Sequence, residues 1–259
     1  MTHETKLHST LEYLHPDAKT GVLLLHGFSS TPGVFSKLTR LLEKQGLSYY
    51  APLLPGHGTT PDDLALYDTE DWIKSADEAY KHLKKYCNNV IILGVSMGGN
   101  LACILANKRK VDGLILAGTP RWLQRGTWIV FYMFVLRFLG IKYYHASFKK
   151  ELKDGLLIGG PAASYGSLQL KSISDALHLI QDETPFYLKN IKSPTLIIQS
   201  DNDGLVNSKS GNYFFQNIPA IDKQLVWISQ PHHSLHKDDS VYTYILDFFN
   251  RIKNSENAS

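Results

Sequence analysis

The sequence contains little cysteine: Cys87 and Cys103 are the only two in 259 residues. Two thiols cannot form a disulfide framework for a chain of this length, and neither lies in the closely spaced pattern of a metal site. Cys103 lies in an apolar run, so we expect it to be a small core residue. The eleven histidines are dispersed along the chain. We therefore predict no bound metal and no cofactor.

Long hydrophobic runs are also missing. The longest, residues 128–139 (WIVFYMFVLRFL), contains Arg137 and is shorter than the roughly 20 apolar residues that span a bilayer. We interpret it as a buried or half-buried helix, with a wall of an acyl-chain site or a lipid-contacting surface as the alternatives. The N-terminal segment MTHETKLHST lacks the basic start and apolar stretch of a signal peptide, so we predict a cytoplasmic protein.

Charge of one sign is not concentrated in any segment. The net charge is +3, and the lysines are scattered apart from short pairs such as Lys84-Lys85. This charge distribution lacks the basic patch that is typical of nucleic-acid binding, so no nucleic-acid partner is predicted. Hydrophobic residues make up 43% of the chain and charged residues 20%, which is typical of a globular protein. The length fits one large α/β domain.

Short aliphatic runs alternate with segments that have helical spacing. Each run is bounded by Gly, Pro, Asn or Asp and is almost continuously apolar, which is typical of strands covered on both faces. The predicted strands are residues 21–27, 48–54, 89–94, 111–118, 193–200 and 223–229, and the predicted helices are 32–46, 69–86, 98–108, 207–217 and 238–253. Strands alternating with helices predict an α/β fold with a mainly parallel sheet and helices on both faces.

One region interrupts this alternation. Residues 121–189 contain no clear core strand and mix aromatic residues with Lys and Gly. We predict a helical cap insertion here, which covers one edge of the sheet. The predicted organisation is a core of residues 1–120 and 190–259 with a cap (lid) insertion at 121–189, called the insertion below.

Residues 94–98, GVSMG, match the pattern G-x-S-x-G. A strand is predicted before them and a helix after them, which is the context of a nucleophile elbow. In such an elbow the serine hydroxyl is held above the sheet on a tight turn. Gly94 and Gly98 are expected to relieve crowding there, and Gly99 to let the helix pack closely. We predict Ser96 as a nucleophile.

A serine hydroxyl needs a base to remove its proton and an acid to orient that base. In this architecture the acid and then the histidine follow the serine, each on a loop after a later strand. The candidates are Asp201 and Asp203 after one strand, and His232, His233 and His236 after the next.

An oxyanion hole in this architecture takes backbone N–H groups from the residue after the nucleophile and from an earlier strand-to-helix loop. These are predicted to be Met97 and Phe28. We expect the nearby His26 and His57 to hold loops by hydrogen bonds. The pair Asp62-Asp63 is interpreted as a helix start.

Several motifs together resemble the α/β-hydrolase superfamily, and within it the bacterial carboxylesterase and monoacylglycerol lipase group. They are LLLHGF, TPGVF, APLLPGHG, GVSMGG, QSDNDGLV and the histidine loop near the C-terminus. The resemblance covers roughly residues 20–118 and 190–250. It implies the α/β-hydrolase fold with a mainly parallel central sheet, helices on both faces and a helical cap insertion.

The resemblance also implies residue roles. Ser96 matches the nucleophile, Asp203 the acid and His233 the base, and Asp201 would then be a turn-capping carboxylate. His232 and His236 stay alternative bases, because His232 stands where the family has a small residue before its catalytic histidine.

The implied activity is carboxylic ester hydrolysis through an acyl-enzyme, on small-molecule esters with short to medium acyl chains. Trp128, Phe131 and Phe134 are predicted to cover the site and bind the acyl chain, and transient contact with a lipid surface is expected. The alternatives are a monoacylglycerol lipase or lysophospholipase, an acyltransferase or thioesterase, and a non-catalytic binding protein. The oligomeric state is not predicted.

Overall fold

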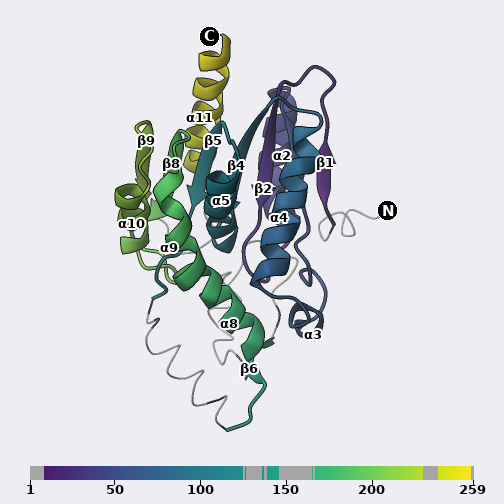
Figure 1. The fold of residues 1–259 in the computed structure, drawn as a ribbon, viewed down its shortest axis with the longest axis vertical. Coiled ribbons are helices and arrows are strands. Elements are labelled where there is room, and N and C mark those ends of the chain that lie inside the picture. Colours follow the sequence, from purple (N-terminus) through teal and green to yellow (C-terminus); the bar gives the residue numbers. More distant parts are fainter. Residues whose placement is uncertain are drawn as a thin grey trace.

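The central element of the protein is a seven-stranded sheet with the order β1-β3-β2-β4-β5-β8-β9 (Figure 1). The computed structural model describes residues 9–124, 126, 136, 139–145, 165, 167–229 and 239–257. The strands are β1 Leu11–Tyr13, β2 Thr20–Leu25, β3 Ser48–Ala51, β4 Asn89–Val95, β5 Gly113–Ala117, β8 Thr195–Ser200 and β9 Lys223–Ile228. All neighbours are parallel except β1 with β3. This confirms the mainly parallel sheet and all six predicted strands; the short edge strand β1 was not predicted.

The strand register aligns the carboxyl ends of the central strands. Leu25 pairs with Gly94 across β2 and β4, and Val95 pairs with Ala117 across β4 and β5. At one side of the sheet, β8 and β9 also end at paired residues. Ligands of open parallel sheets bind outside the carboxyl ends of the strands. The loops after these strands are therefore the candidate location of a functional site.

Helices cover both faces of the sheet, which confirms that prediction. In β2, Leu23 and Leu25 pack in the cluster that contains residues of α4, α5 and α10, while Val22 and Leu24 pack with α2 and α11. Successive side chains of a strand point to opposite faces, so a continuous apolar run is the expected sequence of a strand covered twice. The helices are α2 Ser36–Lys44, α4 Thr69–Lys84, α5 Met97–Lys108, α10 Lys209–Asn217 and α11 Asp239–Asn257.

Part of the insertion packs over α5. Its described elements are β6 Tyr143–His145, β7 Ser167–Gln169, α8 Leu170–His178, a π-helical turn Leu179–Glu183, α9 Thr184–Tyr187 and a 3-10 turn Leu188–Asn190. Leu179 and Leu188 are buried in the same cluster as α5. The boundaries 121–189 stay a prediction. Most of the apolar run 128–139 lies outside the described residues, and no helix among the described residues is long and apolar enough to cross a membrane.

Both cysteines are free and buried. Burial raises the pKa of each thiol. Cys103 is thus a small core residue, as predicted. In the described part of the chain, no three His, Cys, Asp or Glu side chains are grouped as a metal site would require.

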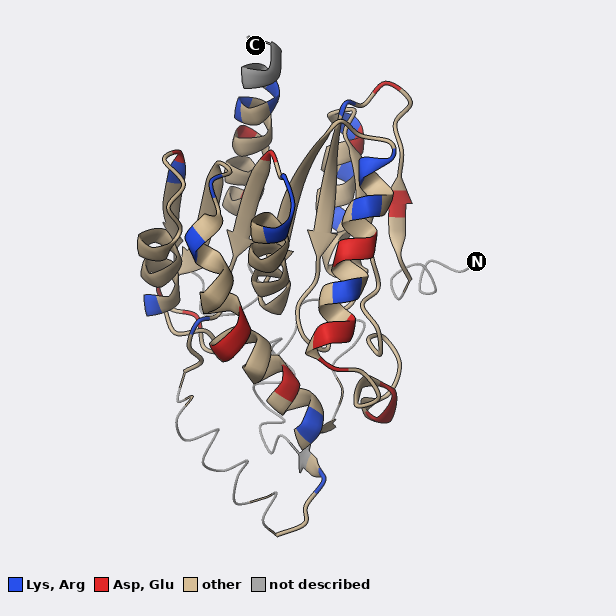
Figure 2. Ribbon diagram, in the orientation of Figure 1, with Lys and Arg blue, Asp and Glu red and all other residues tan. Residues whose placement is uncertain are grey.

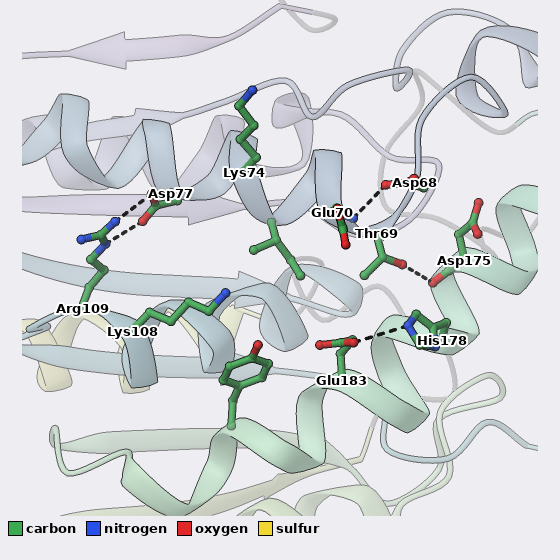
Figure 3. A pocket seen from close by; sticks show the side chains of 12 residues that line it. Asp68, Thr69, Glu70, Lys74, Asp77, Lys108, Arg109, Asp175, His178 and Glu183 are labelled. Atoms are coloured by element: carbon green, nitrogen blue, oxygen red, sulfur yellow. Dashed lines mark hydrogen bonds and ion pairs between the residues drawn. The ribbon is translucent and has the colours of Figure 1, made fainter.

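A groove of about 640 Å³ opens between α4 and the α8–α9 segment (Figure 3). At one end Arg109, which follows α5, donates to both carboxylate oxygens of Asp77 on α4, at 2.6 and 2.9 Å. Lys81 Nζ also lies 2.6 Å from Asp77 Oδ2. Figure 2 shows that both signs of charge alternate along α4. An ion pair at this end of the groove therefore joins α4 to the residue that follows α5.

The groove extends from Asp68 and Thr69 at the start of α4 to Arg109, which follows α5. The 12 residues of α5 separate Ser96 from Arg109. At about 1.5 Å per residue this is a distance of about 18 Å along the helix axis. Only the Arg109 end of the groove is therefore far from Ser96.

Asp77→Asn is expected to lower the free energy of unfolding by about 1 kcal/mol at pH 7, because the pair is partly exposed and screened by solvent. Hydrogen bonds from Arg109 hold the pKa of Asp77 below its ordinary value. The stabilisation is therefore complete above the unfolded-state pKa of about 4 and is lost as the pH falls through the folded-state pKa. Urea unfolding at pH 7 and pH 2.5 measures both effects. Glu78→Gln, an exposed carboxylate on the same helix, is the control and should change neither value; a pH-independent loss in Asp77→Asn would contradict the ion-pair origin.

Candidate active site

Ser96 lies between the end of β4 and the start of α5 with φ 54° and ψ −127°. Among the described non-glycine residues, only Ser29 and Ser96 have positive φ. Such a conformation costs about 1–2 kcal/mol for an L-residue and persists only where the surroundings impose it. The Ser96 side chain is half-buried, so its hydroxyl stays accessible. This is the strand-to-helix elbow that the sequence predicts.

The glycines around Ser96 leave room for this turn. A Cβ on Gly94 would lie 2.2 Å from the carbonyl oxygen of Gly98, and a Cβ on Gly98 would lie 2.0 Å from that of Leu25. A Cβ on Gly99 would lie 1.9 Å from Thr119 Oγ1. A larger residue at Gly94 or Gly98 would have to move backbone, and one at Gly99 would have to displace the Thr119 side chain, so the predicted roles of the three glycines are confirmed.

Backbone hydrogen bonds fix the elbow from both sides. The N–H of Ser96 donates to Ala117 O on β5 at 2.9 Å, and the N–H of Gly99 donates to Ser96 O at 2.8 Å. The turn is thus held by the neighbouring strand and by the first turn of α5. The direction of the Cα–Cβ bond of Ser96 is therefore set by regular structure on each side.

Asp203 follows β8, two strands away from β4 in the sheet. Its side chain is buried, and its Oδ1 accepts hydrogen bonds from the N–H groups of Leu205 at 2.8 Å and Val206 at 2.9 Å. Two backbone donors on one oxygen fix the orientation of the carboxylate. The backbone oxygen of Asp203 also accepts from Gln124 Nε2 at 3.1 Å.

Asp201 differs from the prediction. It was expected to be the carboxylate that caps this turn, but it is exposed and its side chain has no hydrogen bond within the described residues. Asp203 itself closes the turn, because its carboxylate is the one that reaches the N–H groups two and three residues further on. The hydroxyl of Ser200 takes the place expected for Asp201, accepting from the N–H of Asn202 at 3.2 Å.

The histidine loop begins where β9 ends, beside the end of β8. His232, His233 and His236 lie outside the described residues, as do the predicted acyl-chain residues Trp128, Phe131 and Phe134. The choice of base and the acyl-chain site therefore stay predictions.

The loop after β2, residues 26–31, is called the oxyanion loop below. It packs directly against the nucleophile candidate: a Cβ on Gly27 would lie 3.0 Å from Ser96 Cβ and 3.5 Å from Ser96 Oγ. Within the described residues, neither the N–H of Phe28 nor that of Met97 has a hydrogen-bond acceptor. Two unpaired N–H donors beside an accessible hydroxyl are what an oxyanion hole requires.

His26 fixes one of these donors. Its Nδ1 donates to Gly27 O at 2.9 Å, and its Nε2 accepts from the N–H of Leu54 at 3.1 Å. Gly27 O also accepts from the N–H of Ser30 at 3.2 Å. The carbonyl of Gly27 and the N–H of Phe28 belong to one planar peptide unit, so two hydrogen bonds on the carbonyl set the direction of the N–H. The loop-holding role predicted for His26 is confirmed.

His57 lies beside His26 in a buried aromatic cluster. Its ring centroid is 5.0 Å from that of His26, 6.2 Å from Phe28 and 5.7 Å from Trp72. Nδ1 of His57 donates to Pro55 O at 3.1 Å, whereas its Nε2 is buried without a partner in the described part of the chain. Burial, reinforced by His57, lowers the pKa of His26 to about 3, and burial lowers the pKa of His57 to about 4. Both rings are therefore neutral.

Some site contacts have no signal in the sequence. Gln124 holds the Asp203 loop from 79 positions away, and Ser29 adopts φ 51° inside the oxyanion loop. Asp62 lies in the short helix α3, Pro61–Leu64, as predicted, but it also accepts hydrogen bonds from the insertion. Polar residues of these types are common in turns, so only their three-dimensional surroundings distinguish them.

Comparisons with known proteins agree with this geometry. The family model described as "Serine aminopeptidase, S33" matches residues 16–240. A carboxylesterase of Bacillus subtilis (strain 168) is 26% identical over 236 residues, which cover 89% of this chain and 92% of that protein. A thermostable monoacylglycerol lipase of Bacillus sp. (strain H-257) is 28% identical over 221 residues and 82% of each chain.

Solved structures share the fold. A structure from a study of the metagenome-derived lipolytic enzymes LipS and LipT has a TM-score of 0.80 at 22% identity and covers 95% of this chain and 97% of its own. The monoacylglycerol lipase of Paleococcus ferrophilus has a TM-score of 0.74 at 17% identity, with 94% and 98% covered.

We expect the two buried histidines to make the protein sensitive to mild acid. In the unfolded chain a histidine titrates near pH 6.5, far above the folded-state pKa of His26 or His57. The unfolded state therefore binds protons first, so stability is full above about pH 7 and falls as the pH drops from about 6.5 toward 4. At pH 5 each histidine should account for a loss of about 2 kcal/mol.

Urea unfolding at pH 7.5 and pH 5.0 measures this loss. His26→Asn and His57→Asn keep a donor near the Nδ1 position but cannot be protonated, so each should reduce the difference in unfolding free energy between the two pH values by about 2 kcal/mol. The exposed His178, which pairs with Asp182, provides the control: His178→Gln should change that difference by less than about 1 kcal/mol, because a surface ion pair contributes little. An unchanged difference in the His26 and His57 variants would show that neither ring is kept neutral.

Proposed function

The chain belongs to the α/β-hydrolase family described as serine aminopeptidase, S33, and from this premise we propose that it is a serine carboxylic ester hydrolase that works through an acyl-enzyme. The observation that carries the proposal is the arrangement at Ser96. A strained, accessible serine lies against the oxyanion loop, and the N–H groups of Phe28 and Met97 beside it lack acceptors within the described residues.

In the proposed mechanism Ser96 Oγ attacks the ester carbonyl carbon while His233 takes the hydroxyl proton. The carbonyl oxygen becomes an oxyanion and accepts hydrogen bonds from Phe28 and Met97, each donor contributing roughly 3 kcal/mol. The tetrahedral intermediate then breaks its bond to the alcohol oxygen, which takes the proton from His233. Asp203 keeps His233 in the tautomer that accepts the serine proton.

The second half of the cycle restores the enzyme. Water attacks the acyl carbon of the acyl-enzyme and gives a proton to His233, and the bond between the acyl group and Ser96 Oγ breaks as that proton returns to Oγ. The carboxylic acid leaves. The buried carboxylate of Asp203 supports its part in both halves, because its two backbone donors at 2.8 and 2.9 Å hold it in one orientation.

Esters are favoured over peptides as substrates. The family description names an aminopeptidase, but the two curated relatives that cover 89% and 82% of this chain are a carboxylesterase and a monoacylglycerol lipase. The proposal is short- to medium-chain acyl esters, with monoacylglycerols as the second candidate because of the second relative. Trp128, Phe131 and Phe134 as acyl-chain residues, transient contact with a lipid surface and a cytoplasmic location belong to the same proposal.

Ser96→Ala should abolish covalent labelling by a fluorophosphonate and reduce ester turnover by a factor of about 10⁶, because no other group supplies the nucleophile. The assay uses nitrophenyl esters of increasing acyl length, a monoacylglycerol, an acyl thioester and an aminoacyl anilide. Ser29→Ala is the matched control, since Ser29 is the other described serine with positive φ; it should still be labelled. Labelling that persists in Ser96→Ala contradicts the nucleophile, and turnover of the anilide but of no ester favours a peptidase.

Asp203→Asn should lower kcat by about 10⁴, because the amide would hold the histidine in the wrong tautomer. Asp201→Asn, an exposed carboxylate two residues earlier, should stay within about twofold of the wild type. In the same assay His233→Ala should be inactive and His232→Ala active. The reverse result for either pair reassigns the acid or the base.

A further inference from the structure

Tyr165 of the insertion contacts the turn that carries His57. Its hydroxyl accepts from the N–H of Thr59 at 3.2 Å and donates to Gly56 O at 3.3 Å. The side chain is half-buried, and its ring packs against the main core cluster. One hydroxyl of the insertion thus bridges the two backbone positions that flank His57.

The turn itself, residues 54–60 and called the His57 turn below, is tightly folded. Gly56 and Gly58 have φ 75° and 74°, a conformation that side chains rarely adopt. A Cβ on Gly56 would lie 2.7 Å from Leu64 Cα. Thr59 Oγ1 donates to Gly56 O at 3.0 Å, and the N–H of His57 donates to Leu54 O. Tyr165 adds two hydrogen bonds from the insertion to this turn.

The His57 turn supports the oxyanion loop at two points. The ring of His57 lies edge-on to Phe28, at an interplanar angle of 84°. At the start of the turn, the N–H of Leu54 donates to His26, whose other nitrogen holds the peptide unit that carries the N–H of Phe28. Nε2 of His57 has no hydrogen bond to any described residue. The ring is therefore located by packing, by its bond to Pro55 and by the conformation of the turn.

We propose that Tyr165 is a positioning residue for the oxyanion hole: its hydroxyl fixes the His57 turn, and the turn fixes the N–H of Phe28. This rests on the proposed function, in which Phe28 is an oxyanion donor. The insertion then contributes to stabilising the transition state as well as covering the site. Because the oxyanion exists only after attack, a misdirected donor lowers kcat and leaves KM unchanged.

A second contact of the insertion provides the control. Tyr143 on β6 and Gln169 on β7 face each other in register and both donate to Asp62 Oδ1 on α3, each at 2.5 Å. These hydrogen bonds lower the pKa of the exposed Asp62 carboxyl. The contact ties the insertion to α3, which follows the His57 turn, and it includes no hydrogen bond to Gly56 or Thr59. Tyr143→Phe therefore loosens the insertion but keeps the hydroxyl that binds Gly56 and Thr59.

Tyr165→Phe removes only the bridging oxygen. We expect kcat for a short nitrophenyl ester to fall about tenfold with KM unchanged, a fraction of the effect of deleting an oxyanion donor outright. The affinity for an alkyl trifluoromethyl ketone, which forms an oxyanion on the nucleophile, should fall by the same factor. Tyr143→Phe should change kcat and this affinity by less than twofold. Urea unfolding of both variants monitors the fold.

Three results would overturn the proposal: kcat of Tyr165→Phe within twofold of the wild type, an increase in KM with kcat unchanged, or an equal loss in Tyr143→Phe. The last result would assign the effect to general loosening of the insertion. Failure of the proposed function is recognised separately and does not depend on Tyr165: either the wild type turns over no ester, or Ser96→Ala keeps its turnover and its labelling.

Discussion

The backbone conformation of Ser96 is the constraint on which the rest of the site depends. A serine with φ 54° is held only because β5 binds its N–H and α5 begins at the next residue. In the same geometry Gly98 lies so close to β2 that a Cβ on this residue would be 2.0 Å from the carbonyl oxygen of Leu25. Strand β2, the elbow and the first turn of α5 are therefore in backbone contact. Strain at one residue is offset by packing that leaves no other conformation open.

The parallel sheet brings the elbow together with the other loops of the candidate site. Because β2, β4, β8 and β9 all run in the same direction, the loops that follow them meet at one edge. The oxyanion loop, the elbow, the Asp203 loop and the start of the histidine loop each come from one of these strands. The helices that bury the two faces contribute rigidity, and the groove between α4 and α8–α9 extends from the start of α4 to Arg109, which follows α5.

The oxyanion loop is supported by buried polar groups rather than by regular structure. His26 joins the loop after β2 to the loop after β3 through one hydrogen bond on each ring nitrogen. A protonated ring could not accept the bond from Leu54, so the support requires the neutral form that burial imposes. The same burial makes the loop sensitive to acid, because the unfolded chain binds protons that the folded ring excludes. With Tyr165, the support extends to a residue more than 100 positions along the chain.

The sequence by itself determined the fold and the position of the elbow. Continuous apolar runs have the composition of strands covered on both faces, and the glycines around Ser96 have few conformational alternatives. Asp203 and Asp201 could be separated only by resemblance, since both follow the same strand. The tertiary structure decided which of them is buried and closes the turn. It also decided the partners of His26, His57 and Tyr165. Each of these contacts depends on a distance between segments far apart in the chain, and no local pattern of residue types encodes such a distance.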